Sequence, residues 1–342
     1  MLALFSCKKE ALNTKTNQEM DVYVAGFVSD AGSPLYDYNY PLFDPGGGDY
    51  PSYWKNGILV KLDTDRLPNN DYGYTGGRAI SIAVSGNDVY VLGSGLFISS
   101  NRSTIGGISW KNGIRDYDDR AALTVLNNDV YIVEIGNPAT YLKNGKPVGT
   151  LAGSTWADAA TSASISGNDV YVAGTLYSIN SIAKYWKNGN PVNLTDGSKD
   201  AVATSIAVSG TDVYVAGYEF NGSFNVAKYW KNGNPVNLTD GTKDAFATSI
   251  AVSGTDVYVA GTEWNADVNR SPIAKYWKNG NPVNLTNISN WAEARSIAVS
   301  GNDVYVAGFE DGVAKYWKNG IPVILGDVSK YSEAYSIFLA PK

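Results

Sequence analysis

Chemistry in this sequence has to come from carboxylates, tyrosines, lysines and arginines, because its 342 residues contain no histidine and one cysteine. Zinc and most transition-metal sites use imidazole or thiolate ligands, and Ser-His or Cys-His nucleophilic mechanisms need a histidine. The composition argues against both. The net charge of −6 also argues against nucleic-acid binding, which depends on clustered lysine and arginine.

Two acidic segments carry the hard oxygen donors that Ca²⁺ prefers. They contain Asp63, Asp65 and Asp71 in the first segment, and Asp116, Asp118 and Asp119 in the second. The first segment departs from an EF-hand loop, because glycine is missing at its sixth position. Solvated loops are the alternative to a Ca²⁺ site, and we expect no other cofactor.

Aromatic residues gather in segments whose length varies along the chain. The candidates for ligand binding are Tyr36, Tyr38, Tyr40, Trp156, Tyr177, Trp264 and Trp291. Aromatic rings beside Asp and Asn suit a glycan, because the CH groups of a sugar pack on the ring while the polar groups bind its hydroxyls. The same mixture suits a protein interface, and the alternative is that these rings only pack the loops onto the core.

A repeat supplies the elements that must position these residues. Residues 183–217 return as residues 227–261 with two changes, Ser198 becoming Thr242 and Val202 becoming Phe246. A unit of about 40–50 residues is typical of solenoids and propellers. Each unit has an Asp-Val-Tyr-Val segment or a variant of it, which begins at Asp21, Asp88, Asp129, Asp169, Asp212, Asp256 and Asp303. One Lys-Asn-Gly turn follows each segment, so the sequence predicts seven units.

Each unit contains four short runs that are typical of β-strands. Asn-Gly between two such runs predicts a type I′ hairpin turn, because both central residues need a positive φ. Four-stranded sheets repeated around an axis form a β-propeller. The sequence therefore predicts an all-β, seven-bladed β-propeller of four-stranded antiparallel blades, which occupies residues 20–342 as one domain.

The two ends of the chain complement each other. The first unit lacks its first strand, whereas residues 336–339 form a first strand that lacks the rest of its unit. We expect the C-terminal strand to join the first blade as its innermost strand, which closes the ring and removes an exposed sheet edge.

Repeated residues are expected to build the fold, and unrepeated ones are the functional candidates. We expect the repeated Asp to accept hydrogen bonds from backbone amides, the repeated Trp to pack between blades, and the repeated Lys to form a solvated rim. The residues just before the innermost strands should surround the central channel: Arg78, Ala122, Thr161, Thr204, Thr248, Arg295 and Tyr335. The two arginines could bind a carboxylate or sulfate ligand, or pair with nearby acids.

The N-terminus, Leu2-Ala-Leu-Phe-Ser-Cys7-Lys-Lys-Glu, resembles the end of a bacterial lipoprotein signal peptide of the Bacteroidetes type. The resemblance implies a lipidated Cys7, with residues 1–19 as truncated signal and tether, and an outer-membrane, periplasmic or cell-surface location. Only six residues precede Cys7, however, which is shorter than a signal peptide requires. An unmodified cysteine is the alternative. No apolar run is long enough to span a membrane, so a lipid anchor is the expected membrane contact.

Over almost its whole length the chain resembles the repeat propellers of bacterial envelopes. It lacks the signatures of WD-repeat, kelch and sialidase propellers. We expect a monomeric, non-catalytic binding protein that recognises a glycan or a partner protein through the loops of one face, the top face. The alternatives are a carbohydrate-active enzyme, a glycosidase or lyase, that uses two carboxylates, or a purely structural scaffold.

Overall fold

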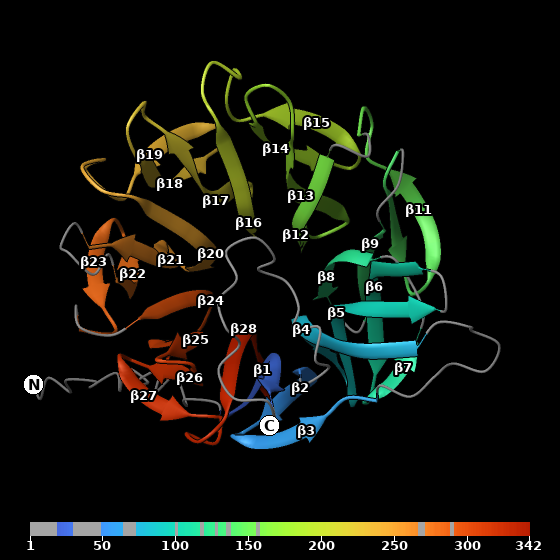
Figure 1. Cartoon of the computed structure of the whole chain (residues 1–342). Coiled ribbons are helices and arrows are strands. Elements are labelled where there is room, and N and C mark those ends of the chain that lie inside the picture. Colours follow the sequence, from blue (N-terminus) through green and yellow to red (C-terminus); the bar gives the residue numbers. More distant parts are fainter. Residues whose placement is uncertain are drawn as a thin grey trace, which may run out of the picture.

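The computed structural model describes residues 19–29, 49–63, 73–99, 102–116, 120–126, 129–134, 138–154, 158–265, 271–287 and 291–342. The regular structure of these residues consists of strands, which form seven four-stranded antiparallel sheets. The sheets surround a central axis like the blades of a propeller (Figure 1). The predicted fold class is confirmed. Helices that could span a bilayer are absent from the described residues.

The strands of each blade follow one another from the axis outward, and we number the blades in chain order. Blade 1 consists of β28 (Tyr331–Pro341), β1 (Met20–Ser29), β2 (Asp49–Lys55) and β3 (Ile58–Lys61). Blade 2 consists of β4 (Gly73–Ser85), β5 (Asp88–Ser99), β6 (Arg102–Lys111) and β7 (Ile114–Asp116). Blade 3 consists of β8 (Arg120–Leu126), β9 (Asp129–Glu134), β10 (Thr140–Lys143) and β11 (Lys146–Thr150).

The remaining four blades follow the same order. Blade 4 consists of β12 (Asp158–Ser166), β13 (Asp169–Leu176), β14 (Ile182–Lys187) and β15 (Asn190–Asn193). Blade 5 consists of β16 (Ala201–Ser209), β17 (Asp212–Phe220), β18 (Asn225–Lys231) and β19 (Asn234–Asn237). Blade 6 consists of β20 (Ala245–Ser253), β21 (Asp256–Trp264), β22 (Pro272–Lys278) and β23 (Asn281–Asn284). Blade 7 consists of β24 (Ala292–Ser300), β25 (Asp303–Glu310), β26 (Val313–Lys318) and β27 (Ile321–Ile324).

The C-terminal strand closes the ring, as the sequence predicts. Strand β28 pairs antiparallel with β1, from Met20 opposite Pro341 to Ser29 opposite Tyr331. Beyond the paired strands, the amide of Lys342 donates to the carbonyl oxygen of Glu19 at 3.1 Å. Blade 7 therefore neighbours blade 1, although the two lie at opposite ends of the sequence.

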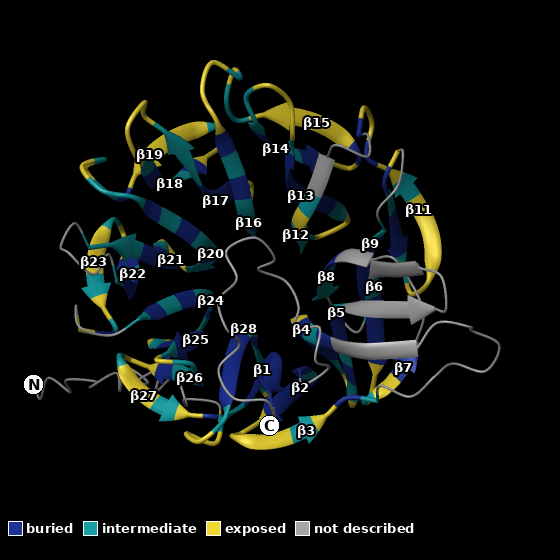
Figure 2. Ribbon diagram, viewed as in Figure 1, coloured by how far each residue is buried: buried dark blue, intermediate teal, exposed yellow. Residues whose placement is uncertain are grey.

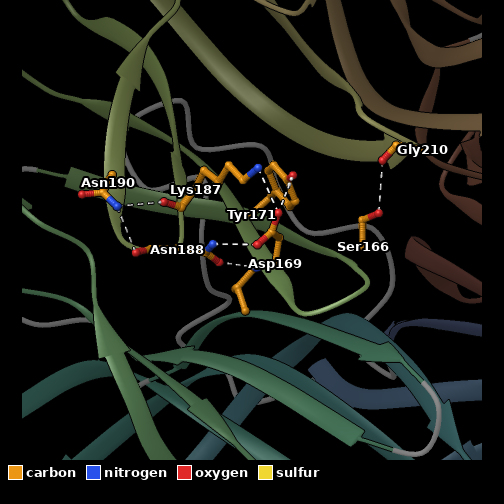
Figure 3. A network of polar contacts seen from close by, with 8 residues as sticks. Ser166, Asp169, Tyr171, Lys187, Asn188, Asn190 and Gly210 are labelled. Atoms are coloured by element: carbon orange, nitrogen blue, oxygen red, sulfur yellow. Dashed lines mark hydrogen bonds and ion pairs between the residues drawn. The ribbon is translucent and has the colours of Figure 1, made fainter.

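A side-chain network ties the second strand of each blade to the Lys-Asn-Gly turn (Figure 3). In blade 4, Asn188 and Gly189 have φ values of 50° and 82°, as a type I′ turn requires. Asn188 Nδ2 donates to Asp169 Oδ1 at 2.8 Å, and Lys187 Nζ lies 2.9 Å from Asp169 Oδ2. The same Asp–Asn and Asp–Lys contacts recur in the other six blades. The repeated Asp thus binds side chains rather than backbone amides, which corrects the sequence expectation. The repeated Lys is paired with this Asp, and its side chain stays 40–50% exposed, as expected for a solvated rim.

A buried tryptophan fills the junction between most pairs of blades. Six tryptophans, Trp54, Trp110, Trp186, Trp230, Trp277 and Trp317, are at most 1% exposed. Each packs against the preceding blade; Trp110, for example, contacts the cluster around Tyr23 and Leu62 of blade 1. The inner and middle strands are buried, whereas the outermost strands are largely exposed (Figure 2).

Blade 3 departs from this pattern because Leu142 stands where the other blades have tryptophan. Among the described residues, a cavity of about 50 Å³ lies at the junction of blades 2 and 3. Its lining includes Leu92 and Trp110 from blade 2 and Leu123 and Ile132 from blade 3. Leu142 pairs with Ile132, one of the lining residues, on the neighbouring strand.

We predict that Leu142→Trp stabilises the protein, because the larger side chain can bury apolar surface in this space. The expected gain in the free energy of unfolding is about 1–2 kcal/mol, measured by urea unfolding. As a control, Ala173→Val adds volume at a fully buried site that has a tryptophan at its junction, and we expect overpacking to cost about 1–3 kcal/mol. Equal destabilisation by both changes would contradict the prediction.

Candidate functional site on the top face

The two ends of the blades differ in how strictly they repeat. The bottom face carries the tight turns after the first and third strands, where Asn56 bonds Asp21 and its counterparts do the same in every blade. The top face carries the loops between the second and third strands and the connections between blades. The charged and aromatic departures from the repeat lie at this top end, so the candidate site is sought there.

Every innermost strand contains a β-bulge near its top end. In blades 4, 5 and 6 the bulged residue is a threonine, Thr161, Thr204 or Thr248. Thr204 Oγ1 donates to the carbonyl oxygen of Ala216 in its own blade at 3.1 Å and to that of Ala247 in the next blade at 2.9 Å. Thr161 and Thr248 bond in the same way. This position therefore joins neighbouring blades.

The other four blades carry Ile80, Ala121, Arg295 and Tyr335 at the bulge. The register thus places Ile80 rather than Arg78 there, and Ala121 rather than Ala122. The bulged residues also lie inside the innermost strands, not just before them, because these strands begin several residues earlier than the sequence pattern indicates. The bulge position stands eight residues before the repeated Asp in blades 2 to 7, so aligning the units on that Asp places Ile80 and Ala121 at the bulge.

Arg78 nevertheless reaches the same group of side chains as Arg295. We call this group the arginine–glutamate cluster: Arg78, Glu293, Arg295, Glu333 and Tyr335, contributed by the innermost strands of blades 2, 7 and 1. Arg295 Nη2 lies 3.0 Å from both Glu293 Oε2 and Glu333 Oε2. Tyr335 OH donates to Glu333 Oε2 at 2.7 Å, and Arg78 Nη1 donates to Tyr335 OH at 3.1 Å.

Further acidic and aromatic side chains surround the cluster. Tyr331 OH donates to Glu333 Oε1, and Arg78 Nη2 lies 3.5 Å from Asp49 Oδ2. The guanidinium of Arg295 lies 4.3 Å from the ring centre of Tyr335, and that of Arg78 lies 4.6 Å from the ring centre of Phe27. These are cation–π distances. Of the two sequence alternatives for the arginines, the structure shows pairing with nearby acids.

The cluster holds Glu333 in its charged form. Burial alone would raise the pKa of Glu333, but the charge of Arg295, the hydrogen bonds from Tyr331 and Tyr335 and the charge of Arg78 together lower it below its usual value. Burial raises the pKa of Tyr335. Glu333 therefore has no proton to donate near neutral pH, and Tyr335 keeps its own.

Trp264 and Trp291 meet on the top face between blades 6 and 7. Their ring centres are 5.4 Å apart and the ring planes make an angle of 85°, which is an edge-to-face contact. Both rings are half-buried. In earlier connections an aspartate stands where Trp291 stands: Asp244 Oδ1 accepts from the amide of Asn225 at 2.8 Å. Trp291 thus replaces a structural hydrogen bond by an aromatic contact.

The other sequence-predicted residues lie apart from this group or outside the described part of the chain. Tyr177 lies on the top loop of blade 4 and is 51% exposed. Residues outside the described part are Tyr36, Tyr38, Tyr40, Trp156, Cys7, Asp65, Asp71, Asp118 and Asp119, together with the side chain of Asp116. Asp63 accepts the indole proton of Trp110 with its carbonyl oxygen at 2.7 Å. The described residues contain no group of acids that could hold a metal ion.

The sequence reasoning missed Asp49, Glu293, Tyr331 and Glu333. Glu293 and Glu333 stand two positions before the bulge, where blades 5 and 6 have Val202 and Phe246. A charged residue at a position that is apolar in sister units is a signal that a column-by-column comparison of the repeats could have found.

Comparisons with known proteins agree with this architecture. Residues 76–103 and 292–314 match the LVIVD repeat. The chain is a repeat β-propeller. No curated protein matches the sequence.

Three solved structures are similar to it at low identity. The first is the computationally designed Ika8 protein, at 18% identity and a TM-score of 0.42, over 80% of this chain and 93% of that one. The second is the WD40 β-propeller domain of Doa1, at 12% identity and a TM-score of 0.47, over 82% of this chain and 97% of that one. The third is the β-propeller domain of the Trilobed protease from Pyrococcus furiosus, at 10% identity and a TM-score of 0.49, over 82% of this chain and 90% of that one.

We predict that Glu333→Gln destabilises the protein by about 3 kcal/mol at neutral pH, because Glu333 is a buried carboxylate that pairs with Arg295 and accepts hydrogen bonds from Tyr331 and Tyr335. The pKa of Glu333 is lower in the folded state than its usual value of 4.5. Its contribution is therefore complete above that value and is lost as the pH falls through the lower folded pKa. Denaturant unfolding across this range should show the difference between wild type and variant shrinking in acid.

The matched control is Glu19→Gln. Glu19 pairs with Lys342, but both side chains are largely exposed, at 80% and 49%, so we expect little change in the free energy of unfolding. A pH-independent difference for Glu333→Gln, or equal costs for the two variants, would contradict the role given to the cluster.

Proposed function

We propose that this chain is a non-catalytic binding protein of the cell envelope, which recognises a partner protein with its top face. One observation carries the proposal: the bottom-face network repeats in all seven blades, whereas the departures from the repeat gather on the top face of blades 6, 7, 1 and 2. A scaffold of repeated residues that presents unrepeated ones on a single face is typical of propellers that bind a ligand there.

A binding role fits the cluster better than catalysis. A glycosidase needs one protonated carboxyl group to act as general acid, and a second carboxylate as base or nucleophile. Glu293 and Glu333 share a single guanidinium nitrogen, and the pKa of Glu333 is lowered. Neither geometry nor charge favours a proton donor in this pair.

The exposed groups favour a protein over a glycan. Sugar hydroxyls need hydrogen-bonding groups that are available to the ligand, whereas Lys228, Lys275 and Lys315 on this face are paired with Glu219, Glu263 and Glu310. The top loops also expose large aromatic and aliphatic side chains. These are Tyr177 at 51%, Ile179 at 101%, Phe224 at 36% and Val328 at 71%. Aliphatic and aromatic anchors are typical of the centre of a protein interface.

The test is affinity capture of an envelope partner by the full-length chain, followed by measurement of its dissociation constant for two variants. Trp264→Ala removes one ring of the aromatic pair and should weaken binding at least tenfold. A tenfold change corresponds to about 1.4 kcal/mol of binding free energy, which a central aromatic residue of an interface can contribute. Phe220→Ala is the matched control, because the amides of Phe220 and Trp264 make the same contact with Asp200 and Asp244, respectively. It should change binding little.

A glycan array tests the competing ligand class with the same variants. Binding of a glycan that is lost with Trp264→Ala would replace the protein partner by a carbohydrate. A partner whose affinity is the same for both variants and wild type would contradict the placement of the site.

Location in the envelope rests on the lipoprotein-like segment that ends at Cys7. We predict that cells expressing the chain from its natural gene, with the sequence upstream of Met1 included, incorporate a labelled fatty acid into it, and that Cys7→Ser abolishes the label because the 342 residues contain no other cysteine. Fractionation should then find wild type with membranes and Cys7→Ser in the soluble fraction. Label retained in Cys7→Ser, or absent from wild type, would contradict the anchor.

A further inference from the structure

Three neighbouring blades share a turn sequence that the other four lack. Blades 7, 1 and 2 have Lys-Asn-Gly-Ile, at residues 318–321, 55–58 and 111–114. Blades 4, 5 and 6 have Lys-Asn-Gly-Asn at the same place, and blade 3 has Lys-Asn-Gly-Lys. The isoleucines are therefore contiguous around the ring only because β28 closes it between blades 7 and 1.

The fold does not require isoleucine at this position. In blade 4, Asn190 Nδ2 turns back to the carbonyl oxygens of Lys187 and Asn188, at 3.4 Å each, and Asn234 and Asn281 do the same in blades 5 and 6. Isoleucine cannot make these contacts. Ile58, Ile114 and Ile321 instead stand 72%, 70% and 69% exposed.

Other apolar side chains extend this surface along the outer strands. Leu59 on β3 is 40% exposed and Ile324 on β27 is 57% exposed. We call the set of Ile58, Leu59, Ile114, Ile321 and Ile324 the apolar rim. Strands β3 and β27 lie next to each other on the outside of the ring and are mostly exposed (Figure 2). Val148, Val192 and Val236 are also exposed on the outer strands of blades 3, 4 and 5, but blades 7, 1 and 2 carry an exposed apolar side chain at the turn as well.

The chain itself indicates what covers the apolar rim. Residues 1–18 join the propeller at Glu19, where Lys342 Nζ lies 2.9 Å from Glu19 Oε2, and Asp21 accepts a hydrogen bond from Asn56 of the blade 1 turn. The N-terminal segment thus leaves from the middle blade of the three. Residues 8–18 can span at most about 40 Å, so an anchor at Cys7 would keep this edge close to the bilayer.

The charges beside the isoleucines occur as ion pairs. Lys55, Lys111 and Lys318 precede the three turns, and their Nζ atoms lie 3.2, 2.7 and 2.9 Å from Asp21, Asp88 and Asp303, respectively. The turns therefore present paired charges beside the isoleucines, so the apolar side chains carry the proposed contact.

We infer that the apolar rim is a membrane-contact surface, which lies against the lipid bilayer. In this orientation the top face does not lie against the bilayer. The choice of a bilayer as the occupant rests on the proposed lipid anchor. A second copy of the chain is the competing occupant, and the experiment below separates the two.

The experiment couples the full chain, through its single cysteine, to phosphatidylcholine vesicles that contain a maleimide lipid, and measures amide hydrogen exchange. Exchange in the three Lys-Asn-Gly-Ile turns should slow at least fivefold on vesicles. The three Lys-Asn-Gly-Asn turns are internal controls and should not change. Equal protection of both sets of turns, or protection of neither, would overturn the inference.

A triple variant, Ile58→Asn, Ile114→Asn and Ile321→Asn, should lose the protection while keeping the fold, because asparagine occupies the same position in three sister blades. Ile179→Asn, on the top face, should keep it. Protection that appears without vesicles, rises with protein concentration and accompanies a dimer in sedimentation would assign the rim to a second copy instead. Since the coupling is chemical, the result does not depend on natural lipidation or on the top-face partner.

Discussion

Antiparallel pairing of β28 with β1 is the interaction on which the rest of the structure depends. It brings the C-terminal residues Glu333 and Tyr335 between Arg295 of blade 7 and Arg78 of blade 2. It also makes the apolar rim continuous across blades 7, 1 and 2. Neither the candidate site nor the rim exists in the open chain, because each is assembled from both ends of the sequence.

The residues of this propeller are of two kinds, those that repeat in successive blades and those that break the repeat. The repeated Asp, Asn, Lys and Trp residues satisfy the turns and fill the junctions, and they do so identically in blade after blade because the local geometry is the same. Residues that break the repeat give up a known structural contact. Arg295 and Tyr335 replace a threonine that joins blades, and Trp291 replaces an aspartate that caps a loop. Such losses identify the positions where another requirement outweighs local stability.

The sequence could predict the fold in detail, because the Asn-Gly turns, the strand runs and the complementary ends are all local patterns. It could not predict the cluster. Arg78 and Ala122 stand two residues before and one residue after the bulged residues of their strands, Ile80 and Ala121. The partners of the arginines, Glu293, Glu333 and Asp49, come from three strands that meet only after the ring closes, and no local pattern encodes that meeting.

The arginine–glutamate cluster also explains why β28 pairs with β1 in the observed register. A buried ion pair contributes little net stability, because desolvation offsets most of the attraction, whereas an unpaired buried charge is costly. A slip of β28 by one residue would turn Glu333 to the opposite face of the sheet and leave Arg295 and Arg78 without it. The native register is thus favoured chiefly by the cost of the alternatives. Because these charges are occupied in fixing the seam, the proposed recognition on the top face would use its aromatic and aliphatic side chains.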